Sequence, residues 1–441
     1  MASSQKVCII GAGSSGLTAC QVLAARGIPF DCFEKGSMIG GNWRYENDNG
    51  TSSAYRSLHI NSARKLMSYR AFPMPEEYPD YPSHFQIAKY FDAYAKRFGL
   101  LERITFRTEV VAAEPDGEGW EVTVEGDDGE RRSERYRAVI VANGHHWKPR
   151  WPEPAFPGAD EYEGEQVHVH HYREPDVLVG KRVLVLGIGN SAVDVAVESS
   201  RIAEKTFLAM RRGAHVIPKF LGGKPVDEAS PPVTTYLPMS VRRFFMKRIL
   251  KVTVGEMTDY GLPEPDHKLL EAHPTVSSEL LPRIGHGDIS VKPNIDRFAG
   301  GRTVRFVDGS EEEIDLVVYC TGYEIEFPFL DKGVFAAVDN RMPLYKRAVS
   351  VENPGLYFVG FVQPLGPVMP LAEAQAEWIA DLLTDRVALP PAMEMRKEIS
   401  EYERWLGRRY VSSKRHTIEV DFHPYRRDIA RERKRRSSQA A

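Results

Sequence analysis

The sequence has few cysteines, and no two of them form a motif. Its 441 residues include four cysteines, at positions 8, 20, 32 and 320, and each stands alone among apolar neighbours. A disulfide reductase needs a redox-active cysteine pair, so the sequence offers no candidate for this class of enzyme. We expect the four thiols to be small core side chains in a reducing compartment.

Long apolar runs and an excess of one charge are also missing. No apolar run approaches the roughly 18 residues that a membrane-spanning helix needs. The 58 basic and 61 acidic residues give a formal net charge of -3, so composition gives no reason to expect nucleic acid as a partner. The start of the chain lacks the pattern of a secretion signal, which predicts a cytoplasmic protein. No spacing of residues is typical of a metal site.

What the sequence does contain is a glycine-rich turn near its start. The apolar run Val7–Ile10 leads into a GxGxxG motif, and Glu34 follows 23 residues after the first glycine. The glycines of this motif are Gly11, Gly13 and Gly16. They allow a tight turn, the approach of a pyrophosphate to the backbone, and close packing of helix on strand. An acid at this spacing accepts hydrogen bonds from ribose hydroxyls and repels a 2′-phosphate, so this half is expected to bind FAD or NAD.

A second motif of this kind begins at the apolar strand Arg182–Leu186. It has the form GxGxxA, with Gly187, Gly189 and Ala192 at its key positions. Its next strand ends in Arg211 and Arg212, near the position that holds Glu34 in the first motif. Two guanidinium groups there suit a 2′-phosphate. The second motif therefore predicts NADPH rather than NADH.

Four further segments carry structural predictions. Ser83 and Gln86 form a capping box that predicts a helix to about residue 98, and Arg135–Val141 reads as one strand. The range 240–252 reads as a basic amphipathic helix; a domain helix with a solvated polar face is favoured over one lying on an anionic membrane. The basic end of the chain, 426–441, is expected to be a solvated or disordered tail.

The chain resembles the flavin-containing monooxygenases over nearly its whole length, most closely the compact soluble bacterial type. The first fingerprint, with the glycine turn before Asn42 and Trp43, is similar to that family's FAD site. The family's FxGxxxHxxxY/F pattern, its NADPH fingerprint and its ATGY linker motif also have counterparts. The counterpart of the FxGxxxHxxxY/F pattern is Tyr162, Gly164, His168 and Tyr172. The counterpart of the NADPH fingerprint is Gly187, Gly189, Asn190, Ser191 and Asp194. The counterpart of the ATGY motif is Cys320, Thr321, Gly322 and Tyr323.

The resemblance and the order of the motifs together predict an α/β fold. It would contain two dinucleotide-binding Rossmann-like domains, with the NADPH domain inserted into the FAD domain. The apolar strands Leu316–Tyr319 and Leu356–Gly360 are expected to continue the first sheet. We place the FAD domain at residues 1–165 and 299–425, and the NADPH domain at residues 166–298.

The resemblance also implies the site residues. Asn61 falls where the family carries an asparagine beside the flavin ring, and we predict it as the catalytic residue. The predicted cofactor-binding residues are Gly11, Gly13, Ser14, Ser15, Gly16, Glu34, Asn42, Trp43, Asn61, Ser62, Thr321, Gly322 and Gln363 for FAD, and Gly187, Gly189, Asn190, Ser191, Asp194, Arg211 and Arg212 for NADPH. His168 is expected to join the linker to the NADPH domain rather than to donate a proton.

The activity implied is that of an NADPH- and O2-dependent enzyme similar to N,N-dimethylaniline monooxygenase. A C4a-hydroperoxyflavin would oxygenate an amine nitrogen or a sulfide sulfur. Tyr172 followed by Arg173 favours this branch over the Baeyer–Villiger enzymes, although ketone substrates stay open. The same residues are also compatible with an uncoupled NADPH oxidase or flavin reductase, and with a redox sensor that has an interaction tail. If the protein forms an oligomer, a homodimer is the default expectation.

Overall fold

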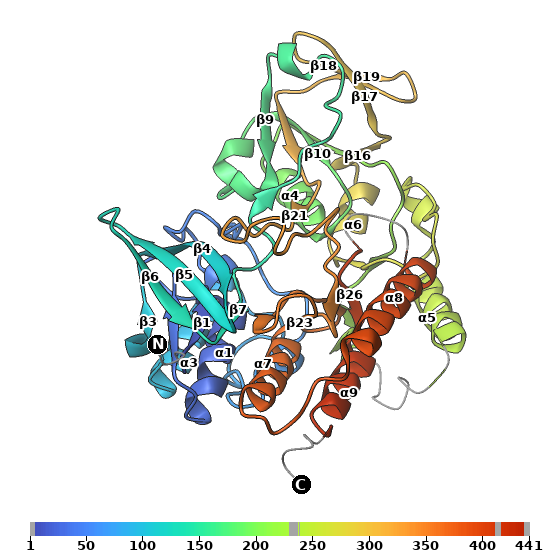
Figure 1. Ribbon diagram of the computed structural model, residues 1–441. Helices are drawn as coiled ribbons and strands as arrows, with labels where there is room; N and C mark the ends of the chain where they lie inside the picture. Colours follow the sequence, from blue (N-terminus) through green and yellow to red (C-terminus); the bar gives the residue numbers. More distant parts are fainter. Residues whose placement is uncertain (1–4, 229–236, 238, 411–415, 436–441) are drawn as a thin grey trace. The chain divides into compact units, whose positions relative to one another are not determined.

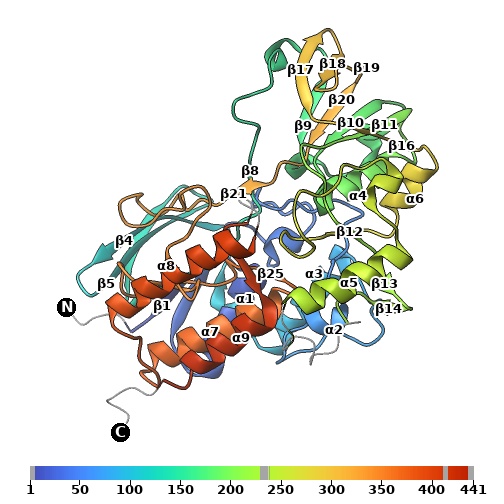
Figure 2. The ribbon, with the colours of Figure 1, turned by 90° about the vertical axis from the view of Figure 1, so that its right-hand side faces the viewer.

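The computed structural model describes residues 5–228, 237, 239–410 and 416–435. The chain divides into two compact units. The first comprises residues of the ranges 1–54, 62–148 and 324–441, and the second comprises 55–61 and 149–323. Two short strands, β8 (Lys148–Pro149) and β21 (Tyr323–Glu324), carry the chain from one unit to the other and back (Figure 2).

The first unit is built on a seven-stranded sheet with the order β22-β23-β24-β7-β1-β2-β3. Its middle strands are parallel, and β1 lies between β2 and β7 with Val7 opposite both Phe30 and Ala138. All four residues of β1 are buried, as they are in β7. The strands are β1 (Val7–Ile10), β2 (Phe30–Phe33), β3 (Ile104–Thr105), β7 (Ala138–Val141), β22 (Leu344–Tyr345), β23 (Val349–Ser350) and β24 (Leu356–Phe358).

Helices α1 and α7 of the first unit pack on each other, and α9 packs on α7 (Figures 1 and 2). The predicted capping box is confirmed, because the Ser83 side chain accepts from the Gln86 amide and the Gln86 side chain accepts from the Ser83 amide. The helices are α1 (Ser14–Ala25), α2 (Arg64–Met67), α3 (His84–Arg97), α7 (Met369–Leu383), α8 (Ala392–Arg409) and α9 (Phe422–Glu432); short 3-10 turns are η1 (Gly41–Trp43) and η2 (Leu101–Arg103).

The segment expected to be one strand, Arg135–Val141, is two strands in two different sheets. Strand β6 (Arg131–Tyr136) pairs with β5 (Gly119–Gly126), which pairs with β4 (Thr108–Asp116) in an antiparallel sheet. After Arg137 the chain enters β7 in the main sheet. Strand β6 is exposed except for its last residue, whereas β7 is wholly buried, so the two halves of the segment suit different environments. The remaining strands of this unit, β25 (Gln363–Leu365) and β26 (Glu419–Asp421), pair in parallel.

The second unit has a five-stranded parallel sheet with the order β16-β11-β10-β20-β9. Its strands are β9 (Glu165–His168), β10 (Arg182–Leu186), β11 (Lys205–Ala209), β16 (Ile289–Lys292) and β20 (Leu316–Tyr319). The prediction that Leu316–Tyr319 continues the first sheet is therefore wrong: this strand lies beside β10. Because β20 belongs here, the compact unit runs from 149 to 323 and not from 166 to 298. Leu356–Phe358 does lie in the first sheet, as expected.

The described residues of the second unit also form an antiparallel sheet and three α-helices (Figure 2). Helix α4 packs on β10 and β11 and contacts α6. The helices are α4 (Asn190–Ser199), α5 (Met239–Thr253) and α6 (Leu280–Gly285), and the sheet comprises β17 (Ile295–Gly300), β18 (Thr303–Phe306) and β19 (Glu311–Glu313). Shorter elements are η3 (Ala159–Glu161), η4 (Val169–His171), η5 (Pro175–Leu178), η7 (Met257–Tyr260), β12 (Val216–Ile217), β13 (Phe220–Leu221), β14 (Lys224–Pro225) and β15 (Thr275–Val276).

Helix α5 corrects the expectation of an ordinary domain helix. All of its residues are described and none is buried. Phe244, Phe245 and Ile249 are 53%, 57% and 47% exposed. A domain helix buries its apolar side against the core, and α5 leaves much of that side open instead. Among the helices that the structure describes, none has the length and apolar character needed to span a bilayer.

The basic end of the chain is a folded element as far as Arg435. Residues 422–432 form α9, in which Ile429 is 1% exposed. The guanidinium of Arg433 pairs with Glu377 and Asp381 on α7. The prediction of a solvated or disordered tail from 426 is therefore wrong for residues 426–435, because apolar side chains at helical spacing are interleaved with the basic ones. Residues 436–441 lie outside the described part of the chain.

Candidate cofactor sites

The glycine turn of the first unit has the geometry that its motif predicts. Gly11 has a φ of +95°, which favours glycine. A β-carbon on Gly16 would lie 1.8 Å from the carbonyl oxygen of Gly11, so only glycine allows this packing of α1 on β1. Helix α1 starts after Gly13 with no side-chain cap and no acidic residue in its first turn. Its first amide groups and the positive end of its dipole are suited to an anion.

Glu34 lies at the end of β2 and is tied to the glycine turn. One carboxylate oxygen accepts from the Ala12 amide at 2.8 Å, and the other accepts from the Gly36 amide at 3.0 Å and the Asn49 side chain at 3.1 Å. The residue is 3% exposed. These three donors fix the orientation of the carboxylate, and the oxygen that accepts from Ala12 keeps a lone pair for a further donor such as a ribose hydroxyl. The contact of Asn49 with Glu34 could not be predicted from sequence spacing.

The turn η1 packs against this glycine motif. A β-carbon on Gly41 would lie 3.0 Å from the α-carbon of Gly13, so the two backbones approach closely. The Asn42 side-chain oxygen accepts from the amide and hydroxyl of Ser53, at 2.8 and 2.7 Å. Trp43 is half-buried. The structure therefore brings Asn42 and Trp43 to the predicted pyrophosphate turn of the first unit.

A glycine outside the two predicted motifs, Gly360, allows the chain that follows β24 to approach the start of α1. A β-carbon on Gly360 would lie 2.0 Å from the hydroxyl oxygen of Ser15. The Gly360 amide donates to the Gln375 side chain at 2.9 Å. Gln363 follows three residues later at the start of β25. A glycine directly after a buried strand was the sequence signal that could have identified this close approach.

The second glycine turn lies between β10 and α4 in the second unit. Gly187 has a φ of +136°, and its β-carbon would lie 2.8 Å from the Cys320 carbonyl oxygen. Asn190 and Ser191 begin α4. The Asn190 side-chain oxygen accepts from the Val276 amide at 2.8 Å. This side chain therefore already holds β15 against the start of the helix.

The two arginines after β11 differ in their partners. Both are exposed. Arg212 pairs with Asp266 at 3.2 Å, and the neighbouring His267 together with this pairing holds the pKa of Asp266 below its usual value. Arg211 forms no hydrogen bond or ion pair with residues 5–228, 237, 239–410 or 416–435. Of the two guanidinium groups, that of Arg211 is therefore the one whose charge no carboxylate of the described residues compensates.

Asn61 lies at the end of a short segment, 55–61, that belongs to the second unit. Its side-chain Oδ1 is buried and has no hydrogen-bond partner within the part of the chain that the structure describes. A buried amide atom without a partner costs free energy unless a ligand or water satisfies it. Ser62, the next residue, falls in the first unit.

Thr321 and Gly322 follow β20 and are held by Arg150. The Arg150 amide donates to Gly322 at 3.0 Å, and its guanidinium donates to the Thr321 carbonyl at 2.9 Å. Both residues lie in the second unit. His168 is fully buried, its Nδ1 accepts from the His170 amide at 3.1 Å, and burial lowers its pKa to about 4. It is therefore neutral at pH 7, and its role in joining the linker to the NADPH domain stays a prediction.

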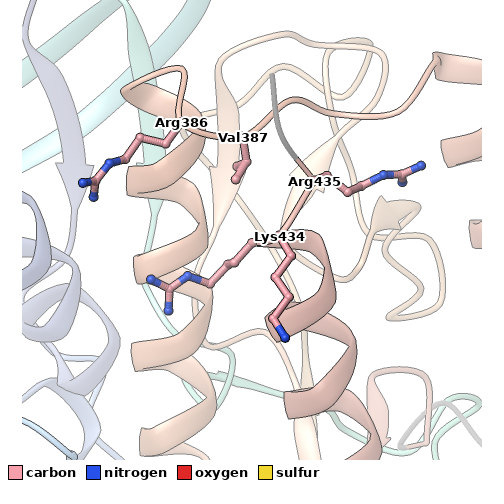
Figure 3. A pocket seen from close by; sticks show the side chains of 5 residues that line it. Arg386, Val387, Lys434 and Arg435 are labelled. Carbon is pink, nitrogen blue, oxygen red and sulfur yellow. The ribbon is translucent and has the colours of Figure 1, made fainter. Parts of the chain in front are cut away.

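A surface hollow of about 310 Å³ lies elsewhere, in the first unit. It is lined by Arg386, Val387, Arg433, Lys434 and Arg435 (Figure 3). None of the predicted cofactor residues lines it. Asp381 lies near both Arg386 and Arg433, and Glu377 also pairs with Arg433. Much of the positive charge of the hollow is therefore compensated where α7 meets the end of α9.

Comparison with known proteins identifies the family. The family model described as flavin-binding monooxygenase-like matches residues 4–437. The chain is 36% identical over 441 residues to flavin-containing monooxygenase 5 of Rattus norvegicus, an alignment that covers 97% of this chain and 82% of the relative. The chain belongs to the flavin-binding monooxygenase-like family.

Two further members of this flavin monooxygenase group support the assignment. Dimethylaniline monooxygenase [N-oxide-forming] 2 of Rattus norvegicus is 34% identical over 413 residues, which covers 90% of this chain and 76% of the relative. The solved S-allyl-L-cysteine S-oxygenase of Allium sativum has a TM-score of 0.74 and 27% identity, and covers 98% of this chain and 89% of that one.

As a member of this family, the protein is an FAD-containing, NADPH-dependent monooxygenase. The predicted fold class is confirmed: two Rossmann-like domains, with the NADPH domain inserted into the FAD domain. Each unit of the structure has one glycine turn between a buried parallel strand and a helix. The monooxygenase therefore has two separate nucleotide folds.

Proposed function

We propose that this monooxygenase oxygenates soft nucleophiles, an amine nitrogen or a sulfide sulfur, by way of a C4a-hydroperoxyflavin. FAD, when bound and reduced by NADPH, supplies the activation of oxygen. The observation that carries the proposal is the buried amide oxygen of Asn61, which has no hydrogen-bond partner among the residues that the structure describes. A side-chain amide can form hydrogen bonds with polar groups of the flavin and the nucleotide, and it does so without placing a charged group beside them.

The remaining site residues are proposed to bind and orient the two cofactors. In the first unit, the amide groups at the start of α1 would face the pyrophosphate of FAD, and Glu34 its ribose. Asn42, Trp43, Ser62, Gln363, Thr321 and Gly322 complete the proposed FAD set. In the second unit, Gly187, Gly189, Asn190 and Ser191 would bind the NADPH pyrophosphate, and Arg211 its 2′-phosphate. Asp194 is not part of this set, because its carboxylate already accepts a hydrogen bond from Tyr55.

The choice between nitrogen or sulfur and ketone substrates rests on two observations. The identifying pattern ends in Tyr172 and Arg173 rather than in Trp followed by Pro or Asp. Two of the relatives are named for N-oxide formation and S-oxygenation. We therefore expect a tertiary amine or a thioether to be a better substrate than a cyclic ketone. The homodimer and the cytoplasmic location stay predictions.

The deciding experiment needs no substrate. The purified holoenzyme is reduced with NADPH without oxygen and then mixed rapidly with oxygenated buffer while the flavin spectrum is followed. We expect a species with blue-shifted absorbance that persists before the oxidised spectrum returns. Direct return with one peroxide released per NADPH would establish an NADPH oxidase instead. Product analysis with a thioether, a tertiary amine and a cyclic ketone then ranks the substrate classes.

A further inference from the structure

The segment 55–61 lies between two stretches of the first unit in sequence, yet it is anchored in the second. Tyr55 is 3% exposed and packs in the apolar core that covers the sheet of the second unit. The Arg56 amide donates to the Arg173 carbonyl at 2.9 Å. The Ser57 hydroxyl donates to Glu198 at 3.2 Å. Segment 55–61 therefore belongs to the nucleotide-binding fold of the second unit, although the residues before and after it in sequence belong to the first.

The strongest of these anchors is the hydroxyl of Tyr55. It donates to the carboxylate of Asp194 at 2.5 Å across 139 residues of sequence. Asp194 lies on α4, one helical turn after Asn190. One further turn along, Glu198 accepts from the hydroxyl of Tyr172. Two carboxylates on one face of α4 thus accept from two tyrosines whose rings lie 5.8 Å apart.

This arrangement gives Asp194 a partner within the protein. The sequence motif places an acid there in a predicted NADPH fingerprint, but the carboxylate is bonded to the segment that ends in Asn61. A hydrogen bond to an ionised carboxylate is among the stronger ones in proteins. The same helix therefore carries the predicted nucleotide contacts at its start and, one turn later, the anchor of segment 55–61.

We propose that Tyr55 is a positioning residue, whose bond to Asp194 fixes segment 55–61 on α4 and so sets the place of Asn61. This inference rests on the role proposed for Asn61. Its consequence is that Asn61 is held by the nucleotide-binding unit, so any movement of α4 is transmitted to it. Loss of the bond would leave both cofactor folds intact and disturb only the placement of the amide.

The test compares Tyr55→Phe with Tyr172→Phe. Each removes one hydroxyl from the same buried cluster, but only the first hydroxyl belongs to segment 55–61. We expect Tyr55→Phe to increase amide hydrogen exchange in residues 56–61 of the FAD-loaded protein by about tenfold. With a thioether as substrate, the fraction of NADPH oxidation released as hydrogen peroxide should rise several-fold with it, while anaerobic flavin reduction stays within a factor of about two. Tyr172→Phe should change neither the exchange nor the peroxide fraction to this extent.

A second pair of variants covers the case in which Tyr55→Phe does not fold because Asp194 is left without a donor. Asp194→Asn keeps an acceptor for the tyrosine, and Tyr55→Phe with Asp194→Asn removes the bond without leaving a buried carboxylate. The double variant should show the fast exchange and high peroxide fraction, and Asp194→Asn should not. Unchanged exchange, or fast exchange with an unchanged peroxide fraction, would overturn the inference.

The same measurements separate this inference from the proposed function. If the wild-type protein releases all of its reducing equivalents as peroxide in the presence of a thioether, a tertiary amine or a cyclic ketone, the proposed oxygenation fails, and the exchange data still report whether Tyr55 anchors the segment. If the wild type oxygenates a thioether and Tyr55→Phe does so with equal coupling, only the positioning role fails.

Discussion

The guanidinium of Arg212 lies 3.2 Å from the carboxylate of Asp266, while the adjacent Arg211 has no such partner among the described residues. The two arginines are equivalent in the sequence motif but not in the folded chain. An arginine whose charge is already paired gains less from a phosphate than one that is free. The structure thus separates two candidates for reading the 2′-phosphate.

We expect Arg211→Ala to raise the KM for NADPH by roughly 10- to 100-fold and to change that for NADH little, because a charge-assisted hydrogen bond contributes about 1.5–3 kcal/mol. Steady-state kinetics with both nucleotides measures this. Arg212→Ala is the matched control and should have the smaller effect. If Arg211→Ala impaired the kinetics with NADPH and NADH equally, Arg211 would not be the residue that binds the 2′-phosphate.

Asn61→Ala tests the proposed catalytic amide. Because its buried oxygen has no hydrogen-bond partner within the described part of the chain, we expect FAD content and anaerobic reduction by NADPH to be kept. Substrate oxygenation should fall about a hundredfold, the usual cost of one lost polar contact at a reacting centre. Stopped-flow spectra and product yield measure the two parts separately. Asn61→Ala with unimpaired oxygenation would show that the residue has only a structural role.

The two later glycines of the first motif should fail in different ways. Gly16→Ala places a methyl group 1.8 Å from a carbonyl oxygen, so we expect it to lower the free energy of unfolding of the cofactor-free protein by about 1–3 kcal/mol or more. Gly13 has a φ of −72°, and its nearest neighbour would be 3.6 Å from the added carbon. Gly13→Ala should therefore keep the free energy of unfolding within about 0.5 kcal/mol and reduce FAD content. Urea unfolding and flavin absorbance distinguish the two.

His168 predicts a pH dependence of stability. Its pKa is about 4 in the folded protein and 6.5 in the unfolded chain, so between these values the unfolded state binds the additional proton. Stability should therefore fall as pH decreases from 6.5 towards 4, by up to about 3 kcal/mol from this residue alone. His168→Gln should lessen the pH dependence of urea unfolding across this window. An unchanged slope would mean that the imidazole is protonated in the folded state.

Because α5 is exposed, we expect substitutions of its apolar residues to change the free energy of unfolding less than substitutions in a helix that is buried against the core. Phe245→Ala should change the free energy of unfolding by less than about 0.5 kcal/mol, because its ring is 57% exposed. Phe91→Ala, at a position on α3 with no exposed surface, should cost about 3–5 kcal/mol. A large loss in Phe245→Ala would indicate that this ring is covered in solution.

The contiguous parts of the sites could be predicted from the sequence, since each needs only neighbouring residues. The strand, turn, helix and acid from Val7 to Glu34 form a local unit, and so does the capping box of Ser83 and Gln86. The roles of the glycines could be predicted because such a turn leaves no room for a side chain and needs backbone angles that favour glycine. The prediction of both nucleotide folds, and the resemblance to the family, rested on these local patterns.

Other features depended on which distant segments meet. A four-residue apolar strand buried on both faces suits either sheet, and only the pairing of β20 with β10 decided its place. Gly360 approaches Ser15, and Tyr55 bonds Asp194, through contacts that no spacing along the chain encodes. The amphipathic pattern of α5 specified a helix but not what covers its apolar side. The sequence by itself thus determined the local geometry of each nucleotide turn, whereas tertiary packing decided sheet membership, burial and the partner of each charged side chain.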